Sequence, residues 1–202
     1  MEQRILIAVT GASGSIYAQR LVDVLRQRVD RVYLLFSETG AKVVRHELSS
    51  HTDGFSLAKA ASGELDPDHR SVVRLLRNDD LFAPVASGSS APTAMVIIPA
   101  SMGCLGRIAH GISGNLIERS ADVCLKQKRP LIICPRESPL NAIHLRNMLD
   151  LANLGTHIVP AMPGFYQRPE TISDLVDFMV GRVLECLGME HELYPAWNSR
   201  MR

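Results

Sequence analysis

The feature that most constrains the fold is an alternation of short, continuously apolar runs with segments of helical spacing. The apolar runs are Ile5–Thr10, Arg31–Ser37, Ala94–Pro99, Pro130–Cys134 and Thr156–Pro160. Strands that are apolar at successive positions are buried on both faces, which happens when helices cover a parallel sheet on each side. The sequence therefore predicts a three-layer α/β/α fold with a mainly parallel sheet.

Apolar residues three and four positions apart predict the covering helices. These helices are Tyr17–Arg28, Asn115–Lys126, Leu140–Leu154 and Thr171–Leu187. The apolar stripe of the last one comprises Ile172, Leu175, Val176, Met179, Val183 and Leu187. Val72–Leu76 is a further candidate strand inside an irregular stretch. We expect a single domain over residues 1–188 and a tail over 189–202, which contains Trp197 and packs on the site or on a neighbouring subunit.

The composition excludes several classes of partner. The net charge is +1 and 46% of the residues are hydrophobic, so no electrostatic feature favours nucleic acid or an acidic membrane. No apolar stretch approaches the ~18 residues that a membrane span needs. The cysteines, at positions 104, 124, 134 and 186, form no C-x-x-C pair. We expect buried thiols, no metal site and a cytoplasmic protein.

The turn Thr10–Ser15 joins the first strand to the first helix and is rich in glycine and serine. Free amides at a helix N-terminus attract anions, so this turn predicts a phosphate site. A plain strand-to-helix turn also favours these residues. The spacing differs from G-x-G-x-x-G, which weakens the case for a dinucleotide.

Small hydroxyl residues follow two further strands. Ser37 ends the second strand, and Ser101-Met102-Gly103-Cys104 follows Ala94–Pro99. Ala86–Ser90 is another loop of small residues. These groups are suited to a ribityl chain or a phosphate, although serine at such a position is also a common helix N-cap.

A set of cationic and phenolic residues predicts a second anion site. Arg119 and Lys126 lie seven positions apart on one predicted helix, and Arg136 follows the strand that ends at Cys134. Tyr166 and Arg182 come later in the chain. Arginine grips phosphate oxygens in bidentate fashion. Each residue alone also fits a solvated surface or a helix C-terminus.

Glu137 lies beside Arg136 and between Pro135 and Pro139. A carboxylate held beside a cation at a strand end is able to move protons on a phosphate. A plain salt bridge remains the alternative.

Several longer motifs resemble the UbiX-like flavin prenyltransferases, a branch of the flavodoxin-like (Rossmann-type) flavoproteins. The resemblance covers nearly the whole chain, from T-G-A-S-G at Thr10 to Asp174–Phe178. Its more specific motifs are Ala86–Ser90, Asn115–Asp122, Pro135–Leu140, His144–Leu149 and Pro163–Tyr166.

The resemblance implies a transfer of a dimethylallyl group from dimethylallyl monophosphate to N5 and C6 of reduced FMN, without a metal. The prenylated FMN serves a partner decarboxylase, and the family forms large homo-oligomers, dodecamers, with sites at subunit boundaries. The residues implied for FMN are Gly11, Ala12, Ser13, Ser37, Ser101, Met102, Gly103, Cys104 and Arg119. Those implied for the substrate phosphate are Ser13, Lys126, Arg136, Glu137, Tyr166 and Arg182, and Glu47 is implied in ring closure.

The chain departs from the family at two places. Cys104 stands where threonine is usual, and Leu81 stands where some relatives carry an aromatic residue. Two alternatives stay open: an FMN-dependent decarboxylase of the same fold, and a non-catalytic FMN carrier subunit. The carrier has no use for Arg136 and Glu137. Peptidyl-cysteine decarboxylases have a Met-Asn motif where this chain has Pro135–Asn141, and a short-chain dehydrogenase needs Y-x-x-x-K, which is absent.

Overall fold

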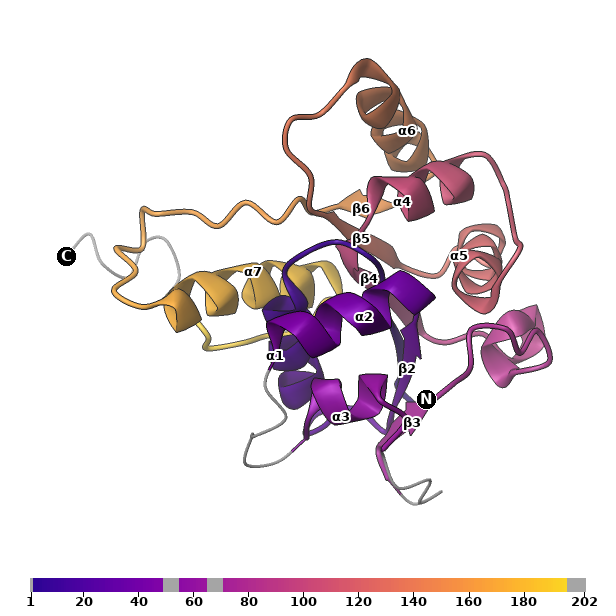
Figure 1. Ribbon diagram of the computed structural model, residues 1–202, viewed down its shortest axis with the longest axis horizontal. Helices are drawn as coiled ribbons and strands as arrows, with labels where there is room; N and C mark the ends of the chain where they lie inside the picture. Colours follow the sequence, from indigo (N-terminus) through magenta and orange to yellow (C-terminus); the bar gives the residue numbers. More distant parts are fainter. Residues whose placement is uncertain (1, 49–54, 65–70, 196–202) are drawn as a thin grey trace.

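A computed structural model describes residues 2–48, 55–64 and 71–195 of the chain. Its centre is a six-stranded sheet in the order β3-β2-β1-β4-β5-β6, and every pair of neighbours is parallel (Figure 1). The predicted parallel sheet is confirmed. The strands are β1 (Arg4–Val9), β2 (Arg31–Phe36), β3 (Val73–Leu75), β4 (Ala94–Ala100), β5 (Leu131–Pro135) and β6 (His157–Ile158).

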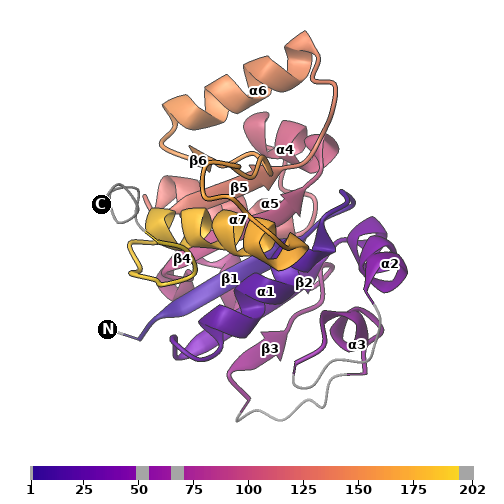
Figure 2. The same cartoon turned by 90° about the vertical axis from the view of Figure 1, so that its left-hand side faces the viewer.

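Helices cover both faces of the sheet, as the predicted three-layer α/β/α fold requires (Figures 1 and 2). One face carries α1 (Ser15–Leu25) and α7 (Ile172–Cys186), and α2 (Glu38–Glu47) and α3 (Leu57–Ala61) add side chains to the same core. The other face carries α4 (Met102–Ala109), α5 (Leu116–Lys126) and α6 (Ala142–Asn153), together with the short turns η1 (Pro84–Ala86) and η2 (Gly88–Ser90).

The two cores follow from the two-residue period of a strand. In β1, Ile5, Ile7 and Val9 enter the core under α1 and α7, whereas Leu6 and Ala8 enter the core under α4 and α5. Each fully buried aliphatic side chain contributes about 1.5–3 kcal/mol. This double burial explains why the strand is apolar at every position.

Two details differ from the sequence prediction. The last predicted strand shrinks to β6, which is partly exposed rather than buried, because it has β5 alone as a neighbour. Ile172, assigned to the apolar stripe of the last helix, is 71% exposed because it is the first residue of α7, where Thr171 caps the helix. The candidate strand at Val72–Leu76 is confirmed as β3.

The order of the strands creates a crevice between β1 and β4. From β1 the chain proceeds to β2 and β3 on one side, whereas β4, β5 and β6 lie on the other. Ligands of such sheets bind at this change of direction, beyond the carboxyl ends of the strands. Thr10 joins the two strand ends here: its Oγ1 donates to the Pro99 carbonyl at 3.0 Å and accepts from the Ser101 amide at 2.7 Å.

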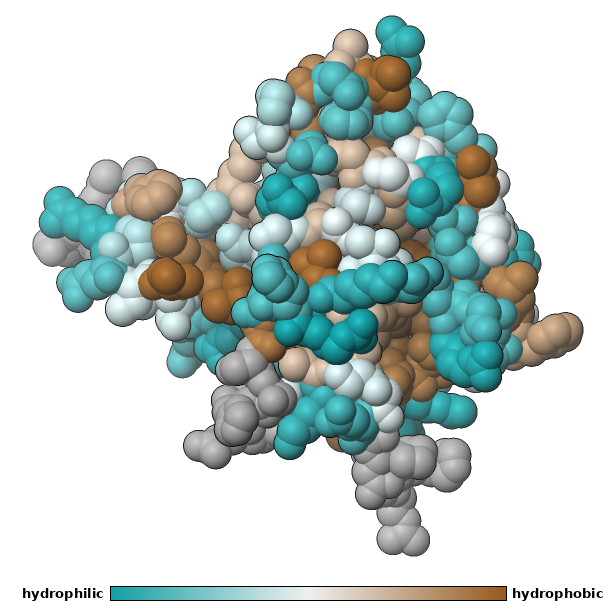
Figure 3. Space-filling model, viewed as in Figure 1, coloured by the Kyte–Doolittle hydropathy of each residue, from teal (hydrophilic) through white to brown (hydrophobic). Residues whose placement is uncertain are grey.

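The surface is polar over much of the face in Figure 3, with apolar areas over α6 and over the segment that leads to α7. Ile143, Leu145 and Leu149 of α6 are more than half exposed, and so are Met162 and Phe165. In the described part of the chain, no helix is both long and apolar enough to cross a membrane.

Candidate active site

The turn between β1 and α1 is held by a carboxylate from another element. Gly14 is the N-cap of α1 with φ 114°, a left-handed conformation that glycine adopts without strain, and it has no side chain to cap the helix. Glu47, at the end of α2, supplies the missing acceptor. Its Oε2 accepts from the Gly14 amide at 3.0 Å and from the Ser15 amide at 2.8 Å.

These hydrogen bonds favour the ionised form of Glu47. Partial burial opposes ionisation, but the bonds from Ser13, Ser15 and Gly14 outweigh it and hold the pKa of Glu47 below its ordinary value. The carboxylate is therefore charged at neutral pH and lies at the positive end of the α1 dipole.

Arg136 reaches the same turn from the end of β5, where its Nε donates to the Ser13 carbonyl at 3.2 Å. Three predicted residues, Ser13, Glu47 and Arg136, thus meet at the β1–α1 turn. Glu137 follows directly and is exposed, and its Oε1 accepts from the Ser138 amide at 3.1 Å. The segment after β5 consequently presents a cation and an acid at the carboxyl edge of the sheet.

A cavity of about 230 Å³ opens at the crevice between β1 and β4. Its lining includes Gly11, Ser37, Ser101 and Cys104 from the predicted cofactor residues. Ser37 also caps α2 through the Gly40 amide at 2.9 Å, and Ser101 caps α4 through the Cys104 amide at 3.4 Å. Both serines are confirmed as helix N-caps and both line the cavity, while their contact with a cofactor stays a prediction.

The wall of the cavity at Gly11 has no room for a side chain. A Cβ there would lie 2.7 Å from Cγ2 of Thr39, another lining residue. Cys104 is 3% exposed, and burial raises the pKa of its thiol to about 12 against the opposing effect of nearby Arg107. The thiol is therefore neutral at physiological pH.

Arg107 contributes a positive charge to this cavity that the sequence analysis did not identify. Its Nε is paired with Oε1 of Glu118, whose side chain is 2% exposed. Oε2 of Glu118 accepts from the Gly114 amide at 2.9 Å. A Cβ at Gly103 would lie 3.6 Å from Nη1 of Arg107, so the guanidinium lies over the first turn of α4.

Glu118 stays charged despite its burial. Desolvation raises its pKa, but the hydrogen bonds from Arg107, Gly114 and Asn115 outweigh that cost and the pKa is lowered. The Arg107 side chain is 48% exposed whereas Glu118 is buried, so it is the carboxylate that would be left buried and unpaired if the arginine were removed.

The donor set of the cavity fits a phosphate ester with a polyol chain. It combines the hydroxyl groups of Ser37 and Ser101, the N-termini of two helices and one guanidinium, and a helix N-terminus favours anions. A volume of about 230 Å³ is below the roughly 300–1,000 Å³ typical of pockets that enclose a whole organic ligand. The cavity is therefore large enough for part of an organic ligand and too small for a whole one.

The remaining predicted residues lie elsewhere. Ala12 and Met102 are buried. Arg119 donates to the Ala86 carbonyl at 3.1 Å and to Asp122 at 3.2 Å. Lys126 lies 4.0 Å from Asp122 and lines a different cavity, next to Leu154. Across residues 2–48, 55–64 and 71–195, no group of His, Cys, Asp and Glu has the arrangement of a metal site.

Tyr166 and Arg182 lie on the α7 side of the sheet. The Tyr166 ring meets Phe178 edge-on, with 5.6 Å between ring centroids, and Arg182 is paired with Glu185. Since α5 and α7 cover opposite faces, one chain does not bring Lys126 and Arg182 together.

Comparison with known proteins decides the family. The family described as Flavoprotein matches residues 1–184. Flavin prenyltransferase UbiX of Halalkalibacterium halodurans is 50% identical over 193 residues, covering 96% of this chain and 92% of the relative. The chain belongs to the flavin prenyltransferases of the flavoprotein family.

Solved structures of flavin prenyltransferase relatives have the same fold. AnUbiX (PadA1), in complex with FMN and dimethylallyl pyrophosphate, has a TM-score of 0.86 at 34% identity, with 98% of this chain and 99% of that chain covered. A dodecameric FMN-dependent UbiX-like decarboxylase from Escherichia coli O157:H7 has a TM-score of 0.85 at 33% identity, with 98% and 100% covered.

The cavity of this flavin prenyltransferase is also lined by residues that were not among the predicted cofactor residues: Glu38, Thr39, Arg107, Asn115 and Ile117. Arg107 and Glu118 are eleven positions apart on different helices, so no local spacing connects them. The one sequence signal for Arg107 was its place six residues after Ser101, the N-cap of α4. Its meaning depends on the buried partner, which a sequence does not reveal.

Proposed function

We propose that this chain transfers a dimethylallyl group from dimethylallyl monophosphate to N5 and C6 of reduced FMN, producing prenylated FMN. The observation that carries the proposal is the meeting of Ser13, Glu47 and Arg136 at the β1–α1 turn, at the same sheet edge as the phosphate-type cavity. A carrier subunit needs the cavity but has no need of the acid and the cation beside it.

In this proposal the cavity binds the phosphate and ribityl end of FMN. Gly11 lines the cavity, Ala12 and Ser13 continue the same turn towards the cofactor, and Ser37 and Ser101–Cys104 provide hydroxyl groups and helix amides. Arg107 neutralises part of the phosphate charge. Arg119 holds the Ala86 loop and borders the flavin. Reduced FMN supplies the nucleophilic nitrogen and the aromatic carbon that form the new bonds.

The side chains manage charge and protons. With reduced FMN bound, the allylic C–O bond would break with its electron pair leaving on the phosphate, and N5 would bond to the allylic carbon and lose its proton. Protonation of the remaining double bond would then let its tertiary carbon bond to C6, which would lose a proton in turn. Arg136, Lys126, Tyr166 and Arg182 stabilise the departing phosphate. Glu137 gives that phosphate a proton, and Glu47 accepts the proton lost from C6.

We further propose that neighbouring copies complete the phosphate site. Asn115, just before α5, lines the cavity, whereas Lys126 ends this helix of 11 residues. A helix of that length spans about 16 Å, so Lys126 lies far from the cavity of its own chain. A homo-oligomer such as a dodecamer brings Lys126 of one copy to another, and the exposed apolar side chains of α6 are suited to such an interface.

The product is proposed to leave for a separate decarboxylase, as the resemblance to the family implies. We place the enzyme in the cytoplasm, where the free thiols of Cys104, Cys124, Cys134 and Cys186 fit a reducing environment. No metal takes part in the proposed steps.

The test is anaerobic incubation of the purified protein with reduced FMN and dimethylallyl monophosphate, followed by mass spectrometry of the released flavin. We expect a flavin heavier by one prenyl unit. The diphosphate donor is run in parallel. Tightly bound but unmodified flavin with both donors would favour the carrier, and release of CO₂ from an aromatic acid without added partner would favour the decarboxylase.

A further inference from the structure

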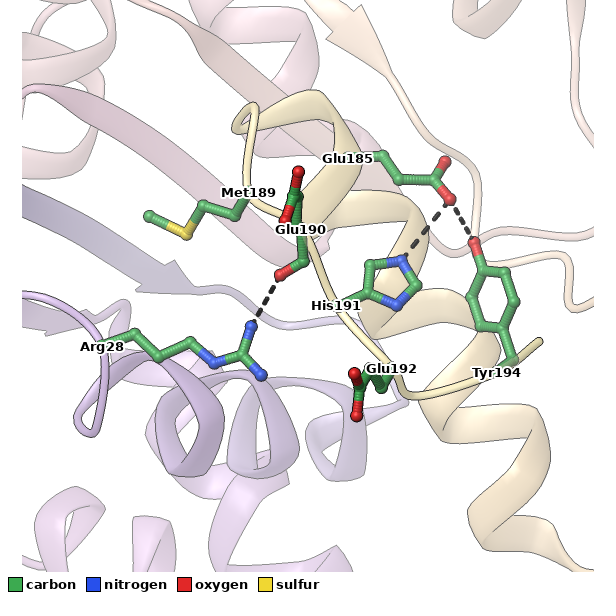
Figure 4. A pocket seen from close by; sticks show the side chains of 7 residues that line it. All are labelled: Arg28, Glu185, Met189, Glu190, His191, Glu192 and Tyr194. Atoms are coloured by element: carbon green, nitrogen blue, oxygen red, sulfur yellow. Dashed lines mark hydrogen bonds and ion pairs between the residues drawn. The ribbon is translucent and has the colours of Figure 1, made fainter. Parts of the chain in front are cut away.

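The C-terminal hook, residues 189–194, folds back along α7 and encloses a cavity of about 550 Å³. Figure 4 shows Glu185, His191 and Tyr194 gathered at one end of it, with the phenol and the imidazole directed at the same carboxylate. Tyr194 Oη donates to Oε1 of Glu185 at 2.6 Å, and Nε2 of His191 lies 3.5 Å from that oxygen. The second carboxylate oxygen pairs with Arg182.

The hook packs directly on the helix backbone. A Cβ at Gly181 would lie 2.3 Å from Cε1 of Tyr194 and 2.7 Å from Cε1 of His191, so glycine is required for this contact. The side chain of His191 is 6% exposed. Arg28, which follows α1, donates to the Glu190 carbonyl at 2.8 Å and so holds the first residues of the hook. The position of Tyr194 is consequently well defined.

A chain of ring contacts extends from the hook to Tyr166. Tyr194 lies against Phe178 with 5.2 Å between centroids, and Phe178 meets Tyr166 edge-on. Gln167, next to Tyr166, donates to the Pro195 carbonyl at 2.9 Å. The hook therefore contacts Phe178, which packs on Tyr166, and it also contacts Glu185, which pairs with Arg182.

We infer that the hook is a positioning element for the substrate phosphate: Tyr194 and His191 hold Glu185, which orients Arg182, and Tyr194 supports Tyr166 through Phe178. This inference rests on the proposed function. Glu185 pairs with Nη1 of Arg182, and the Tyr194 side chain also hydrogen-bonds to Arg182, so two residues hold this guanidinium in place. Tyr194 and His191 contact the Glu185 carboxylate as well. These contacts weaken the hold of Glu185 on Arg182, so the phosphate is able to bind the guanidinium.

The test uses Tyr194→Phe, which removes the hydroxyl group and keeps the ring, and Glu185→Gln, which keeps the shape and removes the charge. Dissociation constants for dimethylallyl monophosphate are measured by calorimetry on protein loaded with oxidised FMN, and KM and kcat are measured with reduced FMN. Glu192→Gln is the matched acid control, because Glu192 lines the same cavity and has no hydrogen-bond or ion-pair partner among the described residues. Tyr33→Phe is the matched tyrosine control, because it removes the hydroxyl group of a buried tyrosine outside the hook.

We expect both variants to raise the KM and dissociation constant of the monophosphate by roughly three- to ten-fold, the range of one intramolecular hydrogen bond. FMN affinity, kcat and the melting temperature should stay near those of the controls. In an Arg182→Gln background, Glu185→Gln should have no further effect, since it acts through that arginine.

Unchanged or lower dissociation constants, a fall in kcat alone, or an effect that adds to that of Arg182→Gln would each overturn the inference. The proposed function is judged separately by the wild type. If the wild type binds the monophosphate but transfers nothing, the reaction is wrong and the binding data still decide the role of the hook. If it does not bind the monophosphate, both proposals fail.

Discussion

The cavity at the β1–β4 crevice and the set of phosphate-binding cations are built in different ways. The cavity is formed by strand ends and helix N-termini of one chain, and its serines are also the caps that allow α2 and α4 to begin. The cations stand on long side chains from α5, α7 and the segment after β5, and two of them are paired with acids of their own helices.

This difference indicates that the cavity is complete in one chain, whereas the set of phosphate-binding cations is not. Backbone groups at a sheet edge are placed by the hydrogen bonds of the sheet itself, so folding and cofactor binding use the same geometry. Side chains on opposite faces of a sheet do not meet unless another copy brings them together. Four experiments test or refine this comparison, beginning with the largest expected effect.

Glu137→Gln tests the proposed proton transfer by Glu137, which lies between the cavity and the set of cations. We expect prenyl transfer to slow by about 10²–10⁴, the usual contribution of a general acid or base, while FMN binding stays unchanged. Turnover is followed by mass spectrometry of the flavin. Wild-type turnover in this variant would remove Glu137 from the mechanism.

Mixing two inactive variants tests whether the cation set comes from several chains. Lys126→Ala and Arg136→Ala should each lose most activity, by about 10²-fold for removal of one charge-stabilising group. Co-expressed, they should form mixed oligomers in which some sites contain both native residues. Activity no higher than that of the single variants would place both residues in the site of one chain.

Arg107→Gln combined with Glu118→Gln tests the charge in the cavity wall, because the double change leaves neither partner of the ion pair charged. We expect FMN to bind about ten-fold more weakly, as for loss of one charge-assisted hydrogen bond, and riboflavin, which lacks the phosphate, to bind as before. Flavin fluorescence titration measures both ligands. Equal weakening of both would mean that Arg107 supports the cavity without contacting the phosphate.

Glu47→Gln isolates the structural part of the β1–α1 turn. The variant should lose about 1 kcal/mol of unfolding free energy at pH 7, as for loss of a helix cap. Because the folded-state pKa of Glu47 is lowered, its contribution is present above the unfolded pKa and disappears as the pH falls through the folded value. Denaturant titrations from pH 7 to 3 should show the wild type and the variant converging, and a constant difference would contradict this.

The sequence by itself determined the layers, the parallel strands and the sheet edge at which a cavity lies. Continuous apolar runs require burial on both faces, and the ends of β1, β2 and β4 then meet at one edge, which identifies Gly11, Ser37 and Ser101. These inferences depend on periodicity and on short segments, which are local properties of a chain. The residues themselves also indicated the cations and Glu137, and the resemblance to the family added Glu47.

The tertiary structure alone decided which side chains meet across elements. It showed that Glu47 of α2 caps α1, that buried Glu118 holds Arg107 in the cavity wall, and that the hook reaches Arg182 through Glu185. It also separated Lys126 from Arg182 by a sheet. Each of these contacts joins residues on different elements, or on the two sides of a turn, whose distance depends on how whole helices and sheets pack. No local pattern of residues encodes such a distance.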